Sequence, residues 1–178
     1  MKKASELQRK EVMDLLSKCW MTHDGMWFFH CVQALGIEKT NELNKSAITS
    51  LSLFEVARLL KILEIETPIE NFEAFKSFFH EASELMIPEF MNVVFSYAKE
   101  NTMAWKVEAG ACFAYKGAHR MGVIAQYECG VLHRVKCWLD AVGIDSRFTP
   151  DIGLCHMHRS GACHGEIELA FSAAPASS

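Results

Sequence analysis

The hydrophobic pattern of the chain changes at Pro88, and this change constrains the fold more than any other feature of the sequence. Before Pro88, apolar residues recur at helical spacing. After it, segments rich in Val, Phe, Tyr and Trp are separated by turn residues, which is typical of strands. Because helices and strands are segregated along the chain instead of alternating, the sequence predicts an α+β fold with an antiparallel sheet backed by helices.

The first half of the chain is expected to contain five helices. Gly36 is placed as the C-terminal cap of the second helix, and Ser52 with Glu55 forms a capping box that opens the fourth. Thr67 and Pro68 are expected to cap and begin the fifth, which ends before Pro88. The helices are expected at about residues 5–19, 26–35, 38–48, 52–63 and 68–87.

The second half is expected to form a sheet in the order strand, strand, helix, strand, strand. The predicted strands are 90–97, 103–113, 147–155 and 166–171, a short helix is expected over 115–121, and a longer helix over 128–142. We expect one α+β domain over residues 1–171, with a helical half (1–88), a sheet half (89–171) and a disordered tail (172–178).

Charge and hydropathy narrow the possible partners. The formal net charge is −4 without a long Lys or Arg block, so we expect no nucleic-acid partner. The N-terminal residues are charged, and no apolar run approaches the length that spans a bilayer, so we expect a cytoplasmic protein without a membrane partner. The expected partner is a small-molecule ligand, and the apolar aromatic helices suggest a homodimer.

Seven cysteines in a reducing compartment favour free thiols, a metal site or a catalytic thiol over disulfides. Four of them fall at the ends of predicted elements, where they could converge. With two nearby histidines they form a candidate zinc site, made of Cys112, Cys129, Cys155, Cys163, His156 and His158. In the alternative interpretation the cysteines pack as small apolar residues and the histidines are solvated.

Cys129 is also a candidate nucleophile. It begins the longer predicted helix, where the helix dipole and the free N–H groups favour the thiolate and lower the thiol pKa. His133 lies one turn onward and could act as its base. In the metal version of the site, the ion lowers the pKa of bound water and His156 or His158 shuttles the proton.

A second group of candidate residues lies at a polar break in the helical half, residues 22–25. The break either separates two helices or kinks one. His23 and Asp24 form a possible acid/base pair, and Trp27 shares a helical face with Cys19, His23 and His30 and is a candidate ligand contact. A helix cap and an aromatic core stripe would also explain these residues. Arg120 could bind a ligand carboxylate, or be a solvated surface residue.

These residues resemble a known family. The N-terminal part of the resemblance rests on Trp20, His23, Asp24, Gly25, Trp27, Phe28, Gly36 and Asn44, and the second part on Cys112, Arg120, Gly122, Cys129, Cys155, Cys163 and Phe171. The chain thereby resembles small bacterial and archaeal cytosolic proteins of unknown function, similar in turn to L-2-amino-thiazoline-4-carboxylic acid hydrolase-like proteins. The resemblance implies an α+β domain that binds a small molecule and a metal at the four spaced cysteines. The chain departs from the pattern at the His-Met-His after Cys155 and at His164.

The function expected from the sequence is therefore small-molecule binding in the cytosol, with a Cys-rich, zinc-binding site. Hydrolysis of a small sulfur- or nitrogen-containing substrate would be its reaction. The alternative is a non-enzymatic sensor or interaction module, in which the cysteines are structural or respond to redox conditions.

Overall fold

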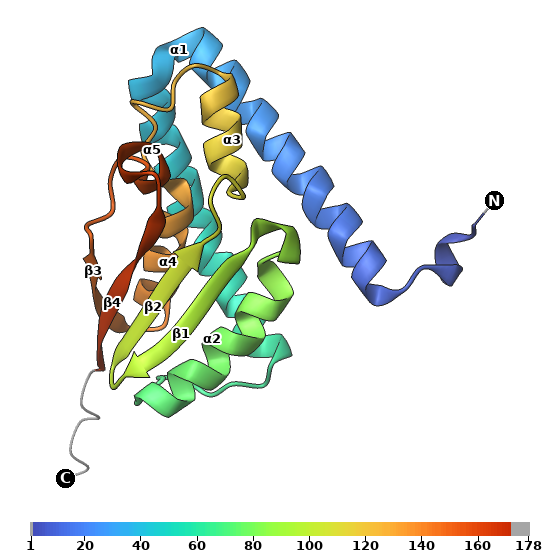
Figure 1. Cartoon of the computed structure of the whole chain (residues 1–178). Coiled ribbons are helices and arrows are strands. Elements are labelled where there is room, and N and C mark those ends of the chain that lie inside the picture. Colours follow the sequence, from blue (N-terminus) through green and yellow to red (C-terminus); the bar gives the residue numbers. More distant parts are fainter. Residues whose placement is uncertain (1, 172–178) are drawn as a thin grey trace.

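Helices precede strands along the chain, as the hydrophobic pattern predicts, and the fold is α+β (Figure 1). The computed structural model describes residues 2–171, so the expected tail at 172–178 lies outside the described residues. A short 3-10 helix, Ala4–Glu6, precedes the first long helix.

A single long element, α1 (Arg9–Ile62), replaces four of the predicted helices. Its one non-helical residue is Gly36, whose φ of 77° places the break where the sequence predicts a cap. We call residues 9–35 the N-terminal arm and residues 37–62 the C-terminal arm; the two arms meet at an angle at the top of Figure 1. The expected break at 22–25 does not occur, because those polar residues lie mostly on the solvent side of a continuous helix.

Two predicted helix starts are wrong. Ser52 and Glu55 form no capping box, because both lie inside α1 and are buried. The helix α2 (Phe72–Met86) begins after the predicted Thr67 and Pro68, with Asn71 as its cap; the Asn71 side chain accepts a hydrogen bond from the Ala74 N–H at 3.0 Å. The first cap signal is overridden because α1 continues through it, and the second because α2 begins four residues later, after Asn71.

The sheet contains four antiparallel strands in the order β1-β2-β4-β3. Their bounds are β1 Val93–Lys99, β2 Thr102–Val107, β3 Ile144–Thr149 and β4 Cys163–Phe171. Both predicted hairpins are present, although β2 ends well before Cys112. Between them lie α3 (Phe113–Arg120) and α4 (Gly130–Ala141), and the second connection contains an unexpected short helix, α5 (His156–Ser160).

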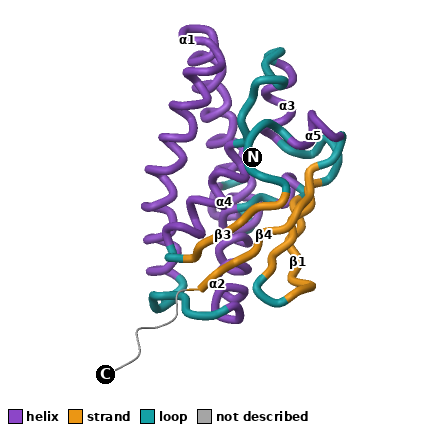
Figure 2. Tube along the Cα trace, turned by 90° about the vertical axis from the view of Figure 1, so that its left-hand side faces the viewer, coloured by secondary structure: helices purple, strands orange, loops and turns teal. Residues whose placement is uncertain are grey.

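The core lies between the sheet and the helices that cover one of its faces (Figure 2). It includes Phe75 and Phe79 of α2, Trp138 of α4, and Trp105 and Ile167 of the sheet. A close approach between neighbouring strands requires glycine at position 165. A Cβ atom there would lie 2.2 Å from the Trp105 ring and 2.4 Å from the Thr149 carbonyl oxygen.

An ion pair joins the C-terminal arm of α1 to α4. The Glu55 side chain is 3% exposed, and its carboxylate accepts two hydrogen bonds from the Arg134 guanidinium, one of them from Nε at 3.0 Å. The Trp138 indole N–H donates to the same carboxylate at 3.0 Å. Because the carboxylate has polar partners on two sides, its burial does not leave an uncompensated charge.

Candidate functional site

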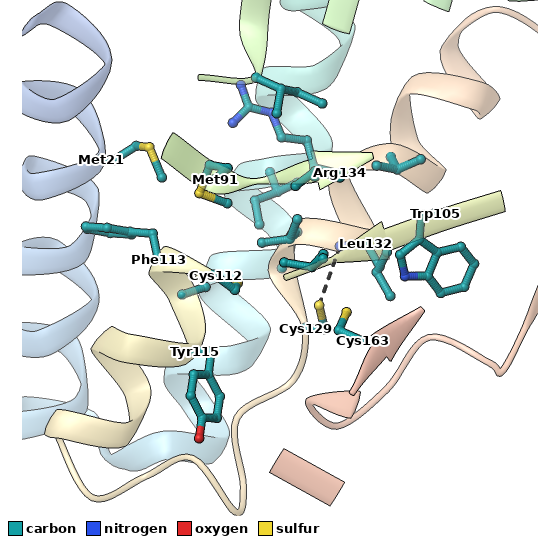
Figure 3. Close-up of a pocket in the computed structure, with 18 of the residues that line it drawn as sticks. Met21, Met91, Trp105, Cys112, Phe113, Tyr115, Cys129, Leu132, Arg134 and Cys163 are labelled. Atoms are coloured by element: carbon teal, nitrogen blue, oxygen red, sulfur yellow. Dashed lines mark hydrogen bonds between the residues drawn. The ribbon is translucent and has the colours of Figure 1, made fainter. Parts of the chain in front are cut away.

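A cavity of about 290 Å³ lies between the N-terminal arm of α1, the sheet, and helices α2, α3 and α4 (Figure 3). Its walls are mostly apolar and aromatic. Met21 of the N-terminal arm and Phe113 of α3 line one side, and Trp105 and Leu132 line the side of the sheet and α4. The topology creates this space because the N-terminal arm leans away from the sheet instead of packing directly on it (Figure 1).

The four cysteines predicted to converge all line this cavity. Cys112, Cys129 and Cys155 are the N-cap residues of α3, α4 and α5, and Cys163 is the first residue of β4. The charges of other cysteines in the group act to raise the pKa of Cys112, Cys129 and Cys163, so the thiols are near neighbours. In Figure 3, the sulfur atoms of Cys129 and Cys163 lie in the same part of the cavity. We call this part of the cavity the thiol end.

The prediction that the helix terminus lowers the pKa of Cys129 is wrong. Burial raises the pKa of this thiol to about 12. The Leu132 N–H does donate to Cys129 Sγ at 3.5 Å and acts in the predicted direction, but burial outweighs it. Burial also raises the pKa of Cys112 and Cys163. These three side chains are therefore neutral thiols at neutral pH.

Two other polar groups at this end of the cavity are buried without a hydrogen-bond partner among the described residues: His156 Nε2 and Trp105 Nε1. Burial is the main reason why the pKa of His156 is lowered, so its ring is neutral at pH 7. The Trp105 N–H acts to lower the pKa of Cys163, but the contact is too loose to count as a hydrogen bond.

The other predicted histidines lie elsewhere. His133 Nε2 is 3.0 Å from Thr49 Oγ1 and 3.5 Å from Cys137 Sγ. Its backbone N–H donates to the Cys129 carbonyl at 3.2 Å within α4, but among residues 2–171 no hydrogen bond joins the His133 ring to the Cys129 thiol. His158 is exposed on α5 and does not line the cavity. The structure therefore brings one of the three histidines, His156, to the cysteines.

The predicted zinc ligands share a cavity but not a coordination geometry. In the described part of the chain, no three His, Cys, Asp or Glu side chains are placed to hold one metal ion together. A tetrahedral site would require the thiols to rotate towards a common centre and to lose their protons. The metal role of these residues stays a prediction.

Arg134 lies on the side of the cavity away from the sulfur atoms of Cys129 and Cys163 (Figure 3), and Trp20 and Asp24, which are both exposed, also line the cavity. The Arg134 guanidinium lies 5.5 Å from the centre of the Trp20 ring. Asp24 is exposed, yet the protein around it removes enough water to raise the pKa of its carboxyl, while Arg134 and His23 act in the opposite direction. We call the part of the cavity lined by Trp20, Asp24 and Arg134 the charged end.

Besides His133 and His158, three further predicted site residues do not line the cavity. His23 and Trp27 are exposed on the outer side of the N-terminal arm, and Arg120 is exposed at the end of α3. Arg134 lines it instead and was not predicted. Its place depends on Glu55, which lies 79 positions away in the sequence, so no local pattern indicates it.

Comparisons with known proteins give one result. The profile of one protein family, described as a family of unknown function (DUF6125), matches residues 3–163. No curated protein and no solved structure matches the chain. A family of unknown function thus covers most of the chain, and nothing in the comparisons links it to amino-thiazoline hydrolase-like proteins, or to bacteria or archaea. Among the described residues, no helix combines the length and the apolar character needed to cross a membrane.

Proposed function

Since the chain belongs to the family of unknown function DUF6125, we propose its function from the site alone: the protein binds a small, mainly apolar molecule in its cavity. The observation that carries this proposal is the cavity of about 290 Å³, walled by apolar and aromatic side chains from five helices and the sheet. Ligand sites are typically concave and apolar, with a few polar groups that fix the orientation of the ligand.

The polar groups of the cavity support binding in a fixed orientation. Neutral thiols lie at the thiol end with His156 Nε2, which has no hydrogen-bond partner within residues 2–171, and Asp24 and Arg134 lie at the charged end. The walls between them are apolar. A bound molecule would replace the water in this space, and burial of its apolar surface would provide most of the binding free energy.

Two neighbouring residues of β1 allow a controlled test. Val93 lines the cavity, whereas Val94 points to the opposite face of the sheet and is 63% exposed. We expect Val93→Trp to fill part of the cavity and to weaken binding of a hydrophobic naphthylamine fluorophore at least about tenfold. Val94→Trp should bind the fluorophore as the wild type does. Equal binding by both variants, or no binding by the wild type, would refute the proposal.

A thiophilic metal at the thiol end is a second candidate, favoured by the gathering of four cysteines from separate elements in one cavity. Zinc there could polarise a bound substrate for hydrolysis, which is the reaction expected from the sequence. Metal analysis of protein purified without a His tag tests this. We expect stoichiometric metal that is lost in Cys155→Ser and kept in Cys19→Ser, because Cys19 is exposed on α1. Metal-free wild-type protein would contradict this candidate.

A redox-responsive sensor is the alternative when no metal is present. Four neighbouring thiols could then form disulfides on oxidation, and mass spectrometry after mild oxidation would detect them. Protein that keeps four free thiols in the cavity under oxidising conditions would argue against such a sensor.

The expected homodimer and the cytoplasmic location stay predictions. The N-terminal arm exposes several large apolar side chains that a partner subunit could cover: Leu15, Leu16, Met26 and Trp27. Light scattering coupled to size-exclusion chromatography measures the mass in solution. A monomer at micromolar concentration would count against the dimer.

A further inference from the structure

Asp24 differs from every other residue at the cavity wall, because it is the one carboxylate among the described residues that line it. Within residues 2–171, the Asp24 side chain takes part in no ion pair and accepts no hydrogen bond. Trp20 lies one helical turn before it on the same face of the N-terminal arm, and the Phe113 ring packs against Gly25, the next residue. The carboxylate therefore lines a mainly aromatic and apolar part of the cavity, and among the described residues it has no hydrogen-bond or ion-pair partner.

Arg134, a positive charge close enough to act on the pKa of Asp24, is already paired. Its Nε and one of its Nη groups donate to Glu55, and the Trp20 ring lies over the guanidinium. Glu55, Arg134 and Asp24 together carry one net negative charge when both carboxyls are ionised. A ligand anion that approached Arg134 would be repelled by the carboxylates of Glu55 and Asp24, whereas a ligand cation would neutralise the net negative charge of the three side chains.

We propose that the apolar ligand of the cavity carries a positively charged amino group, and that this group pairs with Asp24 at the charged end. The proposal rests on the proposed ligand-binding function and specifies the class of ligand: an amphipathic amine. Its apolar part would extend from Asp24 along Met21 and Phe113 towards the thiol end.

The gain in binding free energy for an amine comes from the poor hydration of the Asp24 carboxylate in the empty protein. The desolvation that raises the pKa of this carboxyl is a cost to the empty protein, and an ammonium group would offset it with a charge-assisted hydrogen bond. Arg134 and His23, which also act on Asp24, form no hydrogen bond with it in the part of the chain that the structure describes.

Three probes of equal chain length test the proposal: decylamine, decanol and decanoate, each below its micelle concentration at pH 7. Displacement of the naphthylamine fluorophore from the wild-type protein gives their relative affinities. We expect decylammonium to bind at least about tenfold more tightly than decanoate, with decanol between them. Because this ratio is measured on the wild type, it does not depend on a variant that folds.

Variants then assign the preference to one residue. Asp24→Asn should lower the affinity for decylammonium at least about tenfold and leave decanol unchanged. Asp14→Asn is the matched control, since Asp14 lies on the same helix but does not line the cavity, and it should leave all three affinities unchanged. Far-UV circular dichroism checks that both variants keep their helices.

The outcomes separate the two proposals. If none of the three probes binds, the proposed function fails and this inference fails with it. If decanol binds but decylammonium gains nothing over it, or if Asp24→Asn keeps the preference for the amine, the inference alone is overturned.

Discussion

The ion pair between Glu55 and Arg134 should contribute substantially to stability, and Glu55→Gln tests this. The Glu55 side chain is 3% exposed and that of Arg134 is 34% exposed, so the pair is only partly screened by water. The amide of Gln keeps an oxygen that can accept from Trp138, but it has no charge to pair with the guanidinium. Hydrogen bonds to charged groups contribute about 1.5–3 kcal/mol each.

From these contacts we expect Glu55→Gln to lower the free energy of unfolding by about 2 kcal/mol, because one acceptor remains and Arg134 can still reach some water. In a chain of this length that corresponds to a decrease in Tm of about 4–8 °C. Urea unfolding followed by far-UV circular dichroism measures the free energy, and an unchanged m-value would show that the unfolded state is unaffected.

A double-mutant cycle isolates the pairwise energy. We expect Glu55→Gln and Arg134→Met to be non-additive by at least about 1 kcal/mol, because the second substitution no longer breaks a pair once the first is present. Glu42→Gln is the control; it removes an exposed pair with Lys39 and should cost less than about 0.5 kcal/mol. If the two substitutions add within about 0.5 kcal/mol, the argument that this pair stabilises the α1–α4 interface is refuted.

Three further predictions concern other parts of the molecule. Gly165→Ala should lower the free energy of unfolding by at least about 3 kcal/mol, because the added Cβ would overlap neighbouring atoms. Gly117→Ala in α3 adds a Cβ in free space and should raise the free energy of unfolding by about 0.5–1 kcal/mol; equal effects of the two variants in chemical unfolding would contradict this. Iodoacetamide at pH 8 should modify the exposed Cys19 at least about a hundredfold faster than Cys129, because the pKa of Cys129 is about 12. Peptide mass spectrometry measures both rates, and faster modification of Cys129 would restore it as a candidate nucleophile. Because the pKa of Asp24 is raised in the folded state, ionisation of this carboxyl destabilises the fold, and Asp24→Asn without ligand should have a higher Tm than the wild type at pH 7. The difference in Tm should shrink as the pH falls towards 3.8, the ordinary pKa of Asp, and a lower Tm of the variant at pH 7 would contradict desolvation as the cause of the raised pKa.

Much of the fold could be predicted because its signals are local. The helical spacing before Pro88 and the β-rich segments after it reflect which face of each element is apolar, and this pattern survives in any arrangement of the elements. Gly36 interrupts α1 at the position where the sequence predicts a helix cap, since glycine readily adopts a positive φ. The same local logic correctly placed Cys129 at the start of α4.

The errors arise where tertiary contacts override local preferences. Ser52 and Glu55 carry the pattern of a capping box, but in the folded chain Glu55 is needed as the acceptor for Arg134 and Trp138. The polar residues at 22–25 would favour a turn in a short peptide, yet α1 continues through them to form one wall of the cavity. The helix penalty is below about 0.7 kcal/mol for each of Thr22, His23 and Asp24 and about 1 kcal/mol for Gly25, which packing can offset.

The candidate site divides in the same way. The sequence alone placed the four spaced cysteines at the boundaries of predicted elements, and hence predicted that they could meet. Only Cys129 begins the element that was predicted for it, whereas Cys112 and Cys155 begin the helices α3 and α5 instead of ending strands. Only the tertiary structure decided that their environment is a buried, mainly apolar cavity that keeps Cys129 protonated, and that Asp24 and Arg134 form its other end. Burial and charge pairing depend on residues far apart in the chain, and a pKa or a ligand preference follows from those distant neighbours.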